Sequence, residues 1–212
     1  MSEHYFTSDP KSASRRASAV WAWAGKKYEF ITDAGVFCRG HVDFGSRLLI
    51  DSVPELHGRV LDLGCGYGFV GIAAKLMHPA IDAVLCDINE RAVALARENA
   101  GRLGAQVTAL PSDGFAAVEG RFDFILCNPP VRAGKAVYYP WFEEASRRLN
   151  AGSHGRAGAT GSDQPGGALV IVLQKKQGAP SARRRLEELY PRVTELGREG
   201  GYHVLAAWAA EG

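Results

Sequence analysis

The chain has 212 residues, of which 46% are hydrophobic and 23% are charged, and its formal net charge is +2. These values are typical of a single globular domain, and they exclude a disordered, strongly charged chain. No apolar run is long enough to span a membrane and the N-terminus lacks the apolar region of a secretory signal, so we expect a cytoplasmic protein.

The N-terminal residues are polar and include several Lys and Arg, so residues 1–20 are predicted to form a flexible basic arm. The remainder, residues 21–212, is predicted to form one domain. Residues 28–37 mix apolar side chains with Thr and Asp, which predicts a short hairpin. Residues 47–53 predict a helix that leads into the main fold.

Strand and helix patterns alternate along the rest of the chain. Strands are predicted at residues 60–63, 83–87, 106–110, 122–127 and 168–173, and helices at 70–77, 90–103, 138–149 and 183–190. Two late strands, near Val193 and at residues 202–208, are separated by Gly200 and Gly201 and are predicted to pair antiparallel. This order predicts an α/β fold with a mostly parallel seven-stranded sheet, a C-terminal antiparallel pair and helices on both faces.

Two features of the chain carry no predicted chemistry. Residues 150–167 are rich in Gly, Ser and Ala and offer almost nothing to bury, so we expect a flexible surface loop. The four cysteines form no CxxC pair and no spacing suited to disulfides or zinc. We therefore expect reduced structural thiols and no metal.

A glycine-rich turn follows the strand at residues 60–63 and opens the next helix. It reads Asp62-Leu63-Gly64-Cys65-Gly66-Tyr67-Gly68, and glycines there let the backbone approach a ligand that a Cβ would block. Asp87 ends the next strand, where a carboxylate can accept hydrogen bonds from ribose hydroxyls.

The details of this turn separate two classes of nucleoside. A dinucleotide-binding turn needs glycine where this chain has Phe69, and the carboxylate of Asp62 would repel a pyrophosphate. The same carboxylate suits a cationic group, such as the amine of a methionine moiety. The turn therefore favours S-adenosylmethionine, and a nicotinamide or flavin dinucleotide is the alternative.

Asp113 follows the third predicted strand of the sheet. Its carboxylate could accept a hydrogen bond from the adenine amino group of the cofactor. An ordinary turn aspartate in Ser112-Asp113-Gly114 explains the residue equally well, and both interpretations stay open.

Asn128, Pro129 and Pro130 stand at the carboxyl end of the fourth predicted strand, an edge where open α/β sheets bind ligands. The two prolines contribute carbonyl groups but no N–H donors, so this loop is rich in acceptors. The side-chain oxygen of Asn128 and the carbonyl of Pro129 could grip both hydrogens of an exocyclic amino group and free its lone pair. Positioning, and stabilising the charge that develops on nitrogen, would then be the main catalytic contributions. An ordinary strand-ending Asn-Pro turn is the alternative, which the surrounding motifs disfavour.

Together these motifs resemble the class I methyltransferases, and most closely the RsmC-like family, the methyltransferase small domain. The resemblance covers nearly the whole chain and rests on Thr32 to Phe37, Asp43 to Leu49, the glycine turn, Asp87 and the Asn-Pro-Pro loop. The best-known members methylate the N2 amino group of a guanine in small-subunit ribosomal RNA. The resemblance implies a Rossmann-like methyltransferase fold that binds S-adenosylmethionine.

The candidate site residues divide by role. Cofactor binding is assigned to Asp62, Gly64, Cys65, Gly66, Gly68, Asp87, Ile88, Asp113 and Asn128. Catalytic roles are assigned to Asn128, Pro129 and Pro130. Substrate-side roles are assigned to Asp43, Gly45, Ser46, Val131 and Arg132.

The chain departs from the family pattern in two ways that bear on its substrate. Many amino methyltransferases carry an aromatic residue after Asn-Pro-Pro to stack the base, where this chain has Val131. Stacking would then come from Tyr138, Tyr139 or Trp141, or be absent. Larger members also carry a second domain that helps to hold RNA, so an RNA grip would come from the basic arm, the loop with Lys175 and Lys176, a homodimer partner, or not exist.

Three functions are weighed on these grounds. The leading hypothesis is a guanine N2-methyltransferase whose partner is small-subunit ribosomal RNA. A second keeps the chemistry and changes the acceptor to a protein glutamine amide or adenine N6. The third is a non-catalytic RNA-binding or assembly protein of the same fold.

Overall fold

The fold is built around one seven-stranded β-sheet. In the computed structural model, which describes residues 13–152 and 166–210, this sheet has seven strands in the order β5-β4-β3-β6-β7-β9-β8. Their bounds are β3 Arg59–Leu63, β4 Asp82–Asp87, β5 Val107–Pro111, β6 Phe124–Cys127, β7 Ala168–Gln174, β8 Arg192–Glu199 and β9 Tyr202–Trp208. The strands from β5 to β7 pair in parallel, whereas β9 pairs antiparallel with both β7 and β8. The predicted mostly parallel seven-stranded sheet with an antiparallel C-terminal pair is confirmed.

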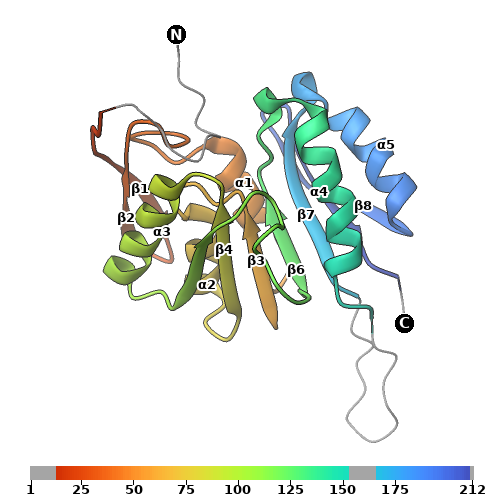
Figure 1. Ribbon diagram of the computed structural model, residues 1–212, viewed down its shortest axis with the longest axis horizontal. Coiled ribbons are helices and arrows are strands. Elements are labelled where there is room, and N and C mark those ends of the chain that lie inside the picture. Colours follow the sequence, from red (N-terminus) through yellow and green to blue (C-terminus); the bar gives the residue numbers. More distant parts are fainter. Residues whose placement is uncertain (1–12, 153–165, 211–212) are drawn as a thin grey trace, which may run out of the picture.

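Helices cover both faces of this sheet. Their bounds are α1 Phe44–Ser52, α2 Phe69–Met77, α3 Glu90–Leu103, α4 Lys135–Arg148 and α5 Ala179–Leu189, with short 3-10 turns η1 Val131–Ala133 and η2 Lys175–Gln177. One buried cluster of side chains draws on α1, α2 and α3, and a second draws on α4 and α5, which lie side by side in Figure 1. Among the described residues no helix is long and apolar enough to cross a membrane.

The N-terminal hairpin lies earlier in the chain than predicted. Strand β1 (Ala17–Trp23) pairs with β2 (Lys26–Thr32), so the hairpin expected at residues 28–37 was placed wrongly. The turn between the strands has φ values of 49° at Ala24 and 74° at Gly25, the left-handed pair that suits a two-residue hairpin turn. The turn was missed because Ala24 is a residue type that seldom adopts positive φ.

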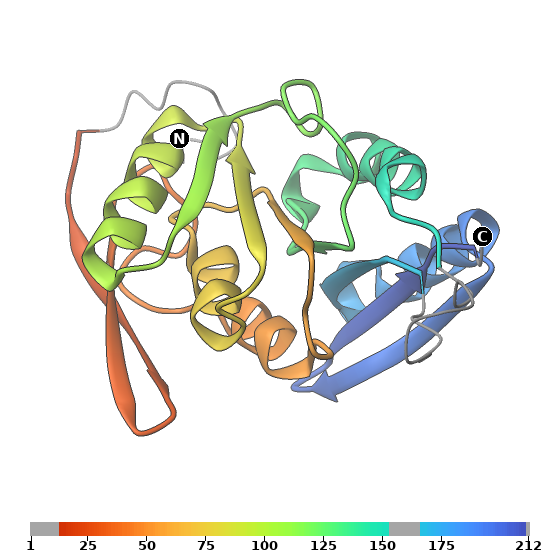
Figure 2. The ribbon, with the colours of Figure 1, turned by 90° about the horizontal axis from the view of Figure 1, so that it is seen from below.

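The hairpin packs on α3 at one end of the molecule, opposite the C-terminal strands (Figure 2). The predicted arm at residues 1–20 also needs correction, because residues 17–20 belong to β1. Just before this strand, Arg16 forms a two-pronged ion pair with Glu98 on α3, with both N···O distances 2.9 Å. Residues 1–12 of the arm lie outside the described residues.

Three helices begin several residues earlier than predicted. Helix α1 begins at Phe44 rather than Arg47. Helix α4 begins at Lys135 rather than Tyr138, and α5 begins at Ala179 with a proline in its first turn, where the missing N–H has no intrahelical partner to lose. Most of the loop predicted at residues 150–167 lies outside the described residues. At its ends, the N–H of Gly167 donates to the carbonyl of Asn150 at 2.8 Å.

The order of the strands determines where the sheet can form a ligand-binding crevice. The chain runs from β3 outward through β4 to β5 and then returns to place β6 on the other side of β3. Parallel strands end at one edge, and register pairs Leu63 with Cys86 and Asp62 with Leu126. The loops after β3, β4 and β6 therefore leave the sheet side by side, at the topological switch point where α/β sheets open a crevice.

Candidate active site

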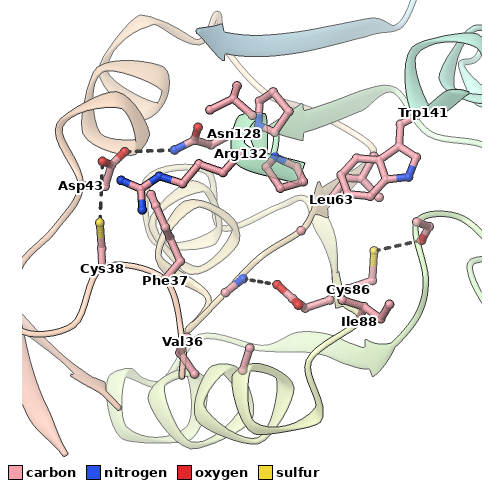
Figure 3. A pocket seen from close by; sticks show the side chains of 18 of the residues that line it. Val36, Phe37, Cys38, Asp43, Leu63, Cys86, Ile88, Asn128, Arg132 and Trp141 are labelled. Atoms are coloured by element: carbon pink, nitrogen blue, oxygen red, sulfur yellow. Dashed lines mark hydrogen bonds between the residues drawn. The ribbon is translucent and has the colours of Figure 1, made fainter. Parts of the chain in front are cut away.

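A cavity of about 430 Å³ opens at this switch point (Figure 3). The loops that follow β3, β4, β5 and β6 line it, together with residues 36–38 of the segment that precedes α1. A second hollow of about 30 Å³ adjoins it, and both share Asp43, Gly64, Gly66 and Asn128 in their walls. Residues predicted from two separate motifs, the glycine turn and the Asn-Pro-Pro loop, thus face one space.

The glycine turn presents bare backbone to the cavity. Gly64 and Gly66 have φ values of 77° and 55°, in the left-handed region that favours glycine. The N–H groups of Gly64 and Cys65 both donate to the carbonyl of Cys86 at 2.9 Å, which ties the turn to the end of β4. A Cβ built at Gly66 would meet nothing within 4 Å, so the space above it is open to a ligand.

Gly68 serves packing instead. It has a φ of 89°, and a Cβ there would lie 2.9 Å from the side chains of both Ile72 and Ala96. Glycine at this position lets the start of α2 approach α3. It does not line the cavity, so the cofactor-binding role predicted for it would act through the shape of the turn.

Asp62 places a buried carboxylate behind the turn. The residue is 3% exposed, and its Oδ2 accepts a hydrogen bond from the N–H of Gly71 at 2.8 Å. Burial raises the pKa of this carboxyl to about 7, and the nearby charge of Asp87 adds to the shift. No described residue pairs this carboxylate with a cation, so a positively charged ligand group beside it would be favoured.

Asp87 ends β4 beside the same turn. Its Oδ2 accepts from the N–H of Gly66 at 2.8 Å and its Oδ1 from the N–H of Asn89 at 2.9 Å. Burial raises the pKa of Asp87. Each oxygen keeps acceptor capacity for a further donor, which fits two neighbouring hydroxyl groups of a ribose.

Asn128 is held by two residues from the start of α1. Its Nδ2 donates to Oδ2 of Asp43 at 3.0 Å and to Oγ of Ser46 at 2.9 Å. Asp43 is also the N-cap of α1, since the N–H of Ser46 donates to its Oδ2 at 2.8 Å. An ionised carboxylate only accepts hydrogen bonds, so the NH₂ of Asn128 must face Asp43. The amide oxygen of Asn128, to which no described residue donates, is thereby kept as an acceptor.

The carbonyl of Pro129 is the second acceptor in this loop. It already receives one hydrogen bond, from the N–H of Val131 at 2.8 Å. Pro130 between them has φ −74° and ψ 74°, the backbone of an inverse γ-turn. One lone pair of the Pro129 carbonyl therefore remains for a ligand donor, beside the amide oxygen of Asn128.

A loop that sequence reasoning left without a role covers the cavity. Val36, Phe37 and Cys38 line it, and Figure 3 shows Cys38 and Phe37 beside Asp43. The N-terminal side of this loop is fixed because Asn89 Nδ2 donates to the carbonyl of Gly35 at 2.8 Å. The family resemblance at residues 32–37 was the one signal that pointed to this loop.

The predicted site residues fall into three groups. Those that line the larger cavity are Asp43, Gly64, Gly66, Asp87, Ile88, Asn128, Pro129, Pro130, Val131 and Arg132. Those that line the smaller hollow alone are Ser46, Asp62 and Cys65. Gly45, Gly68 and Asp113 line neither. Asp113 is exposed, although its neighbours Ser112 and Gly114 do line the cavity.

Several aromatic residues were considered for stacking, and one of them reaches the cavity. Trp141 lines it, on the side away from Asp43 in Figure 3. Tyr138 is buried against Phe142 at a ring-centroid distance of 5.6 Å. Tyr202, which sequence reasoning missed, also lines the cavity, and a Cβ at Gly45 would lie only 3.0 Å from its ring. Gly45 therefore leaves room for Tyr202.

Comparison with known proteins shows the family to which the chain is similar. Residues 27–206 match the family described as the methyltransferase small domain. The chain is 41% identical to YbxB of Bacillus subtilis, a protein described as uncharacterized, over 98% of both chains. It is also 41% identical to the ribosomal RNA small subunit methyltransferase C of Photobacterium profundum, over 50% of this chain and 31% of that protein.

A solved structure is similar over most of the chain. The T. thermophilus 16S rRNA N2 methyltransferase RsmC, in complex with AdoMet and guanosine, gives a TM-score of 0.75 at 27% identity. The match covers 93% of this chain and 51% of that one. The chain thus spans about half, or less, of the named methyltransferases that it matches.

Proposed function

The chain belongs to the methyltransferase small domain family and is an S-adenosylmethionine-dependent methyltransferase, and from that premise we propose that its acceptor is the N2 amino group of a guanine in small-subunit ribosomal RNA. One observation carries the proposal: Asp43 and Ser46 fix the amide of Asn128 so that its oxygen is free at the cavity that also holds the glycine turn. An amino group gripped there lies next to the methyl-donor site.

The donor end of the cavity fits S-adenosylmethionine. Gly64 and Gly66 leave their backbone open, the carboxylate of Asp62 suits the cationic methionine moiety, and Asp87 suits the ribose hydroxyls. The bound cofactor supplies a methyl group that is activated by its sulfonium charge. The residues of this chain supply position and charge complementarity.

The acceptor end suits an amino group of low nucleophilicity. The lone pair of an exocyclic amine is delocalised into its ring, and two oxygen acceptors that hold both hydrogens favour its localisation on nitrogen. The amide oxygen of Asn128 and the free lone pair of Pro129 provide these acceptors. As nitrogen gains positive charge during methylation, the same two oxygens interact with it more strongly, which is the condition for lowering the barrier.

The choice of guanine in ribosomal RNA is supported by similarity. RsmC from T. thermophilus, solved with AdoMet and guanosine, has the same fold over 93% of this chain. The Photobacterium profundum relative is named as a small-subunit ribosomal RNA methyltransferase. Since this chain spans only part of both proteins, the acceptor must be tested directly.

The test uses tritium-labelled S-adenosylmethionine with two substrates: small-subunit ribosomal RNA stripped of protein, and intact small subunits. We expect label in RNA, and nucleoside mass spectrometry should identify it as N2-methylguanosine. The Asn128→Ala variant, which keeps the donor end, is the matched control and should incorporate label about 10²–10³-fold more slowly. Label in N6-methyladenosine, or in protein alone, would refute the guanine proposal. Absence of label in a single-turnover reaction with every substrate would favour a non-catalytic role.

A further inference from the structure

We propose that four cations on one side of the cavity mouth, Arg132, Lys135, Lys175 and Lys176, bind phosphates of the RNA strand on either side of the target nucleotide. We call these residues the basic rim. The inference rests on the proposed function, because it takes RNA as the substrate. It assigns the RNA grip to residues within the domain, rather than to a second domain or a second copy of the chain.

The basic rim comes from two turns that meet at the cavity. Arg132 lies in η1 and Gln177 in η2, and both line the cavity. Figure 3 shows the side chain of Arg132 extending past Asn128 toward Asp43 and Phe37, which also line the cavity. Lys135 bridges the two turns, because a Cβ built at Gly178 would lie 3.8 Å from its Cε. Lys175 and Lys176 occupy the same short turn as Gln177.

None of these four cations forms an ion pair with any described residue. Lys135 makes one cation–π contact, with its Nζ 5.9 Å from the ring centroid of Tyr139. Further along α4 and α5, four of the five arginines form ion pairs with neighbouring carboxylates, and Arg184 pairs with no described residue. These ion pairs are Arg147–Glu143 at 2.7 Å, Arg148–Glu144 at 2.8 Å, Arg183–Glu187 at 2.9 Å and Arg185–Glu188 at 2.8 Å.

This contrast within one helix pair argues against an ordinary solvated surface. On the exposed faces of α4 and α5, the paired arginines have acidic partners three or four residues away in the same helix. This spacing gives weak but favourable ion pairs. At the cavity mouth no described carboxylate forms an ion pair with these four cations, and holding like charges together is mildly unfavourable. A set of exposed, unpaired cations keeps its full attraction for an external anion and releases counterions when that anion binds.

The position of the basic rim favours a nucleotide chain as the anion. A nucleotide whose base enters the cavity must leave its flanking phosphates at the mouth, where the basic rim stands. An acidic protein segment, by contrast, has no charged group whose position at the cavity mouth is fixed by its covalent structure. The donor end differs from the mouth, since Asp62 and Asp87 make its walls acidic and suited to the cationic cofactor. Phosphates are therefore attracted to the mouth and repelled from the donor end.

The chain offers a closely matched pair of variants. Lys175→Gln/Lys176→Gln removes two adjacent exposed lysines from the basic rim. Lys26→Gln/Lys27→Gln removes two adjacent exposed lysines from the hairpin, where neither residue lines the cavity. Both variants lose the same charge at exposed positions. The measurements are kcat, KM for small-subunit RNA across a salt series, and cofactor affinity by calorimetry.

We expect the basic-rim variant to raise KM for RNA about tenfold at moderate salt, and to lower the slope of log KM against log salt by about one to two. Its kcat and cofactor affinity should match the wild type, and Lys175→Arg/Lys176→Arg should restore KM. The hairpin variant should resemble the wild type throughout.

Two results separate the inference from the proposed function. If the wild type methylates RNA and the two lysine pairs behave alike, the basic rim does not bind phosphate, although the proposed function stands. If the wild type methylates protein and no RNA, the proposed function and the inference both fall. In that case a rise in KM for the protein substrate in the basic-rim variant would identify an acidic protein as the occupant of the rim.

Discussion

The two ends of the cavity are built in different ways. At the donor end, backbone N–H groups of the glycine turn make the holding contacts, as when the N–H of Gly66 donates to the carboxylate of Asp87, 21 residues away. At the acceptor end, the amide of Asn128 is held by the side chain of Asp43, 85 residues away. The donor end therefore depends on backbone shape and buried charge, whereas the acceptor end depends on the orientation of one amide. Substitutions at the two ends should change different kinetic quantities.

The largest effect is expected from Asn128→Ala. This change removes one of two oxygen acceptors, and the loss of a positioned hydrogen-bonding group that acts on developing charge lowers kcat by about 10²–10³-fold. Cofactor affinity should stay within about twofold of the wild-type value, because the turn and Asp87 are untouched. This change is smaller than the loss of one hydrogen bond would cause. Rapid-quench methylation assays and calorimetry measure the two quantities. An equal loss of cofactor affinity would show that the ends do not act separately.

Asp43→Asn tests whether the amide is oriented from a distance. Asparagine keeps the N-cap of α1, because its Oδ1 can still accept from the N–H of Ser46. The same oxygen accepts from Nδ2 of Asn128, so the substitution keeps both contacts but replaces a charged acceptor by a neutral one, which holds the amide of Asn128 less firmly. We expect kcat to fall about 10–100-fold, as for residues that orient a reacting group, with an unchanged melting temperature.

The matched control for Asp43→Asn is Asp43→Ala, which removes both the cap and the contact to Asn128. It should lower the melting temperature as well as kcat, because loss of a helix cap costs about 1 kcal/mol. A fall in kcat for the alanine variant alone would mean that Asp43 supports the helix and does not orient Asn128.

Asp62→Asn probes the charge at the donor end. Asparagine can still accept the hydrogen bond from Gly71, so the substitution removes charge and keeps the contact. We expect cofactor affinity to fall about tenfold at pH 8. A loss of this size is typical when a hydrogen bond or contact loses its charged partner. Since kcat at saturating cofactor should change little, this variant gives the converse of Asn128→Ala.

The pH dependence of Asp62 gives a second measurement with opposite signs for binding and stability. Because burial raises the pKa of Asp62 to about 7, the folded protein holds a proton there that the unfolded chain has already lost. The contribution of Asp62 to the unfolding free energy should therefore fall as pH rises from about 4 to about 7. Cofactor affinity should rise across pH 7 as the carboxylate ionises. Both trends should be absent in Asp62→Asn, which denaturant titration and calorimetry can check.

The same contrast explains how far the sequence could predict the structure. The donor end lies in short contiguous motifs, so its strands, its turn and the acids Asp62 and Asp87 were predicted correctly in place. The acceptor end needed a contact between Asp43 and Asn128 that no local pattern encodes. Phe37 and Tyr202 were missed for the same reason, since they reach the cavity from a loop and a strand that fold back on it.

The hairpin shows a different limit of sequence reasoning. Its turn places Ala24 at a φ of 49°, which tertiary packing imposes against the preference of alanine. Trp21 and Phe30, on the two strands, pack against Phe69 of α2 with ring centroids 5.7 and 5.4 Å apart, and this burial stabilises the turn. Local preference was the weaker influence here, and the mixture of apolar side chains with Thr and Asp at residues 28–37 predicted the hairpin too late in the chain.

The smallest effect is expected from Asp113→Ala. The sequence left Asp113 open between a contact to the adenine of the cofactor and an ordinary turn aspartate. Its side chain is exposed, and the cavity wall beside it is made by Ser112 and Gly114. An exposed hydrogen bond contributes about 0.5–1 kcal/mol, so cofactor affinity should fall by about fivefold at most. Calorimetry at fixed pH measures this, with Asp62→Asn as the reference for a buried carboxylate. A loss larger than that of Asp62→Asn would mean that the turn at residues 112–114 closes over the adenine when the cofactor binds, and that the donor end is less preformed than its backbone contacts indicate.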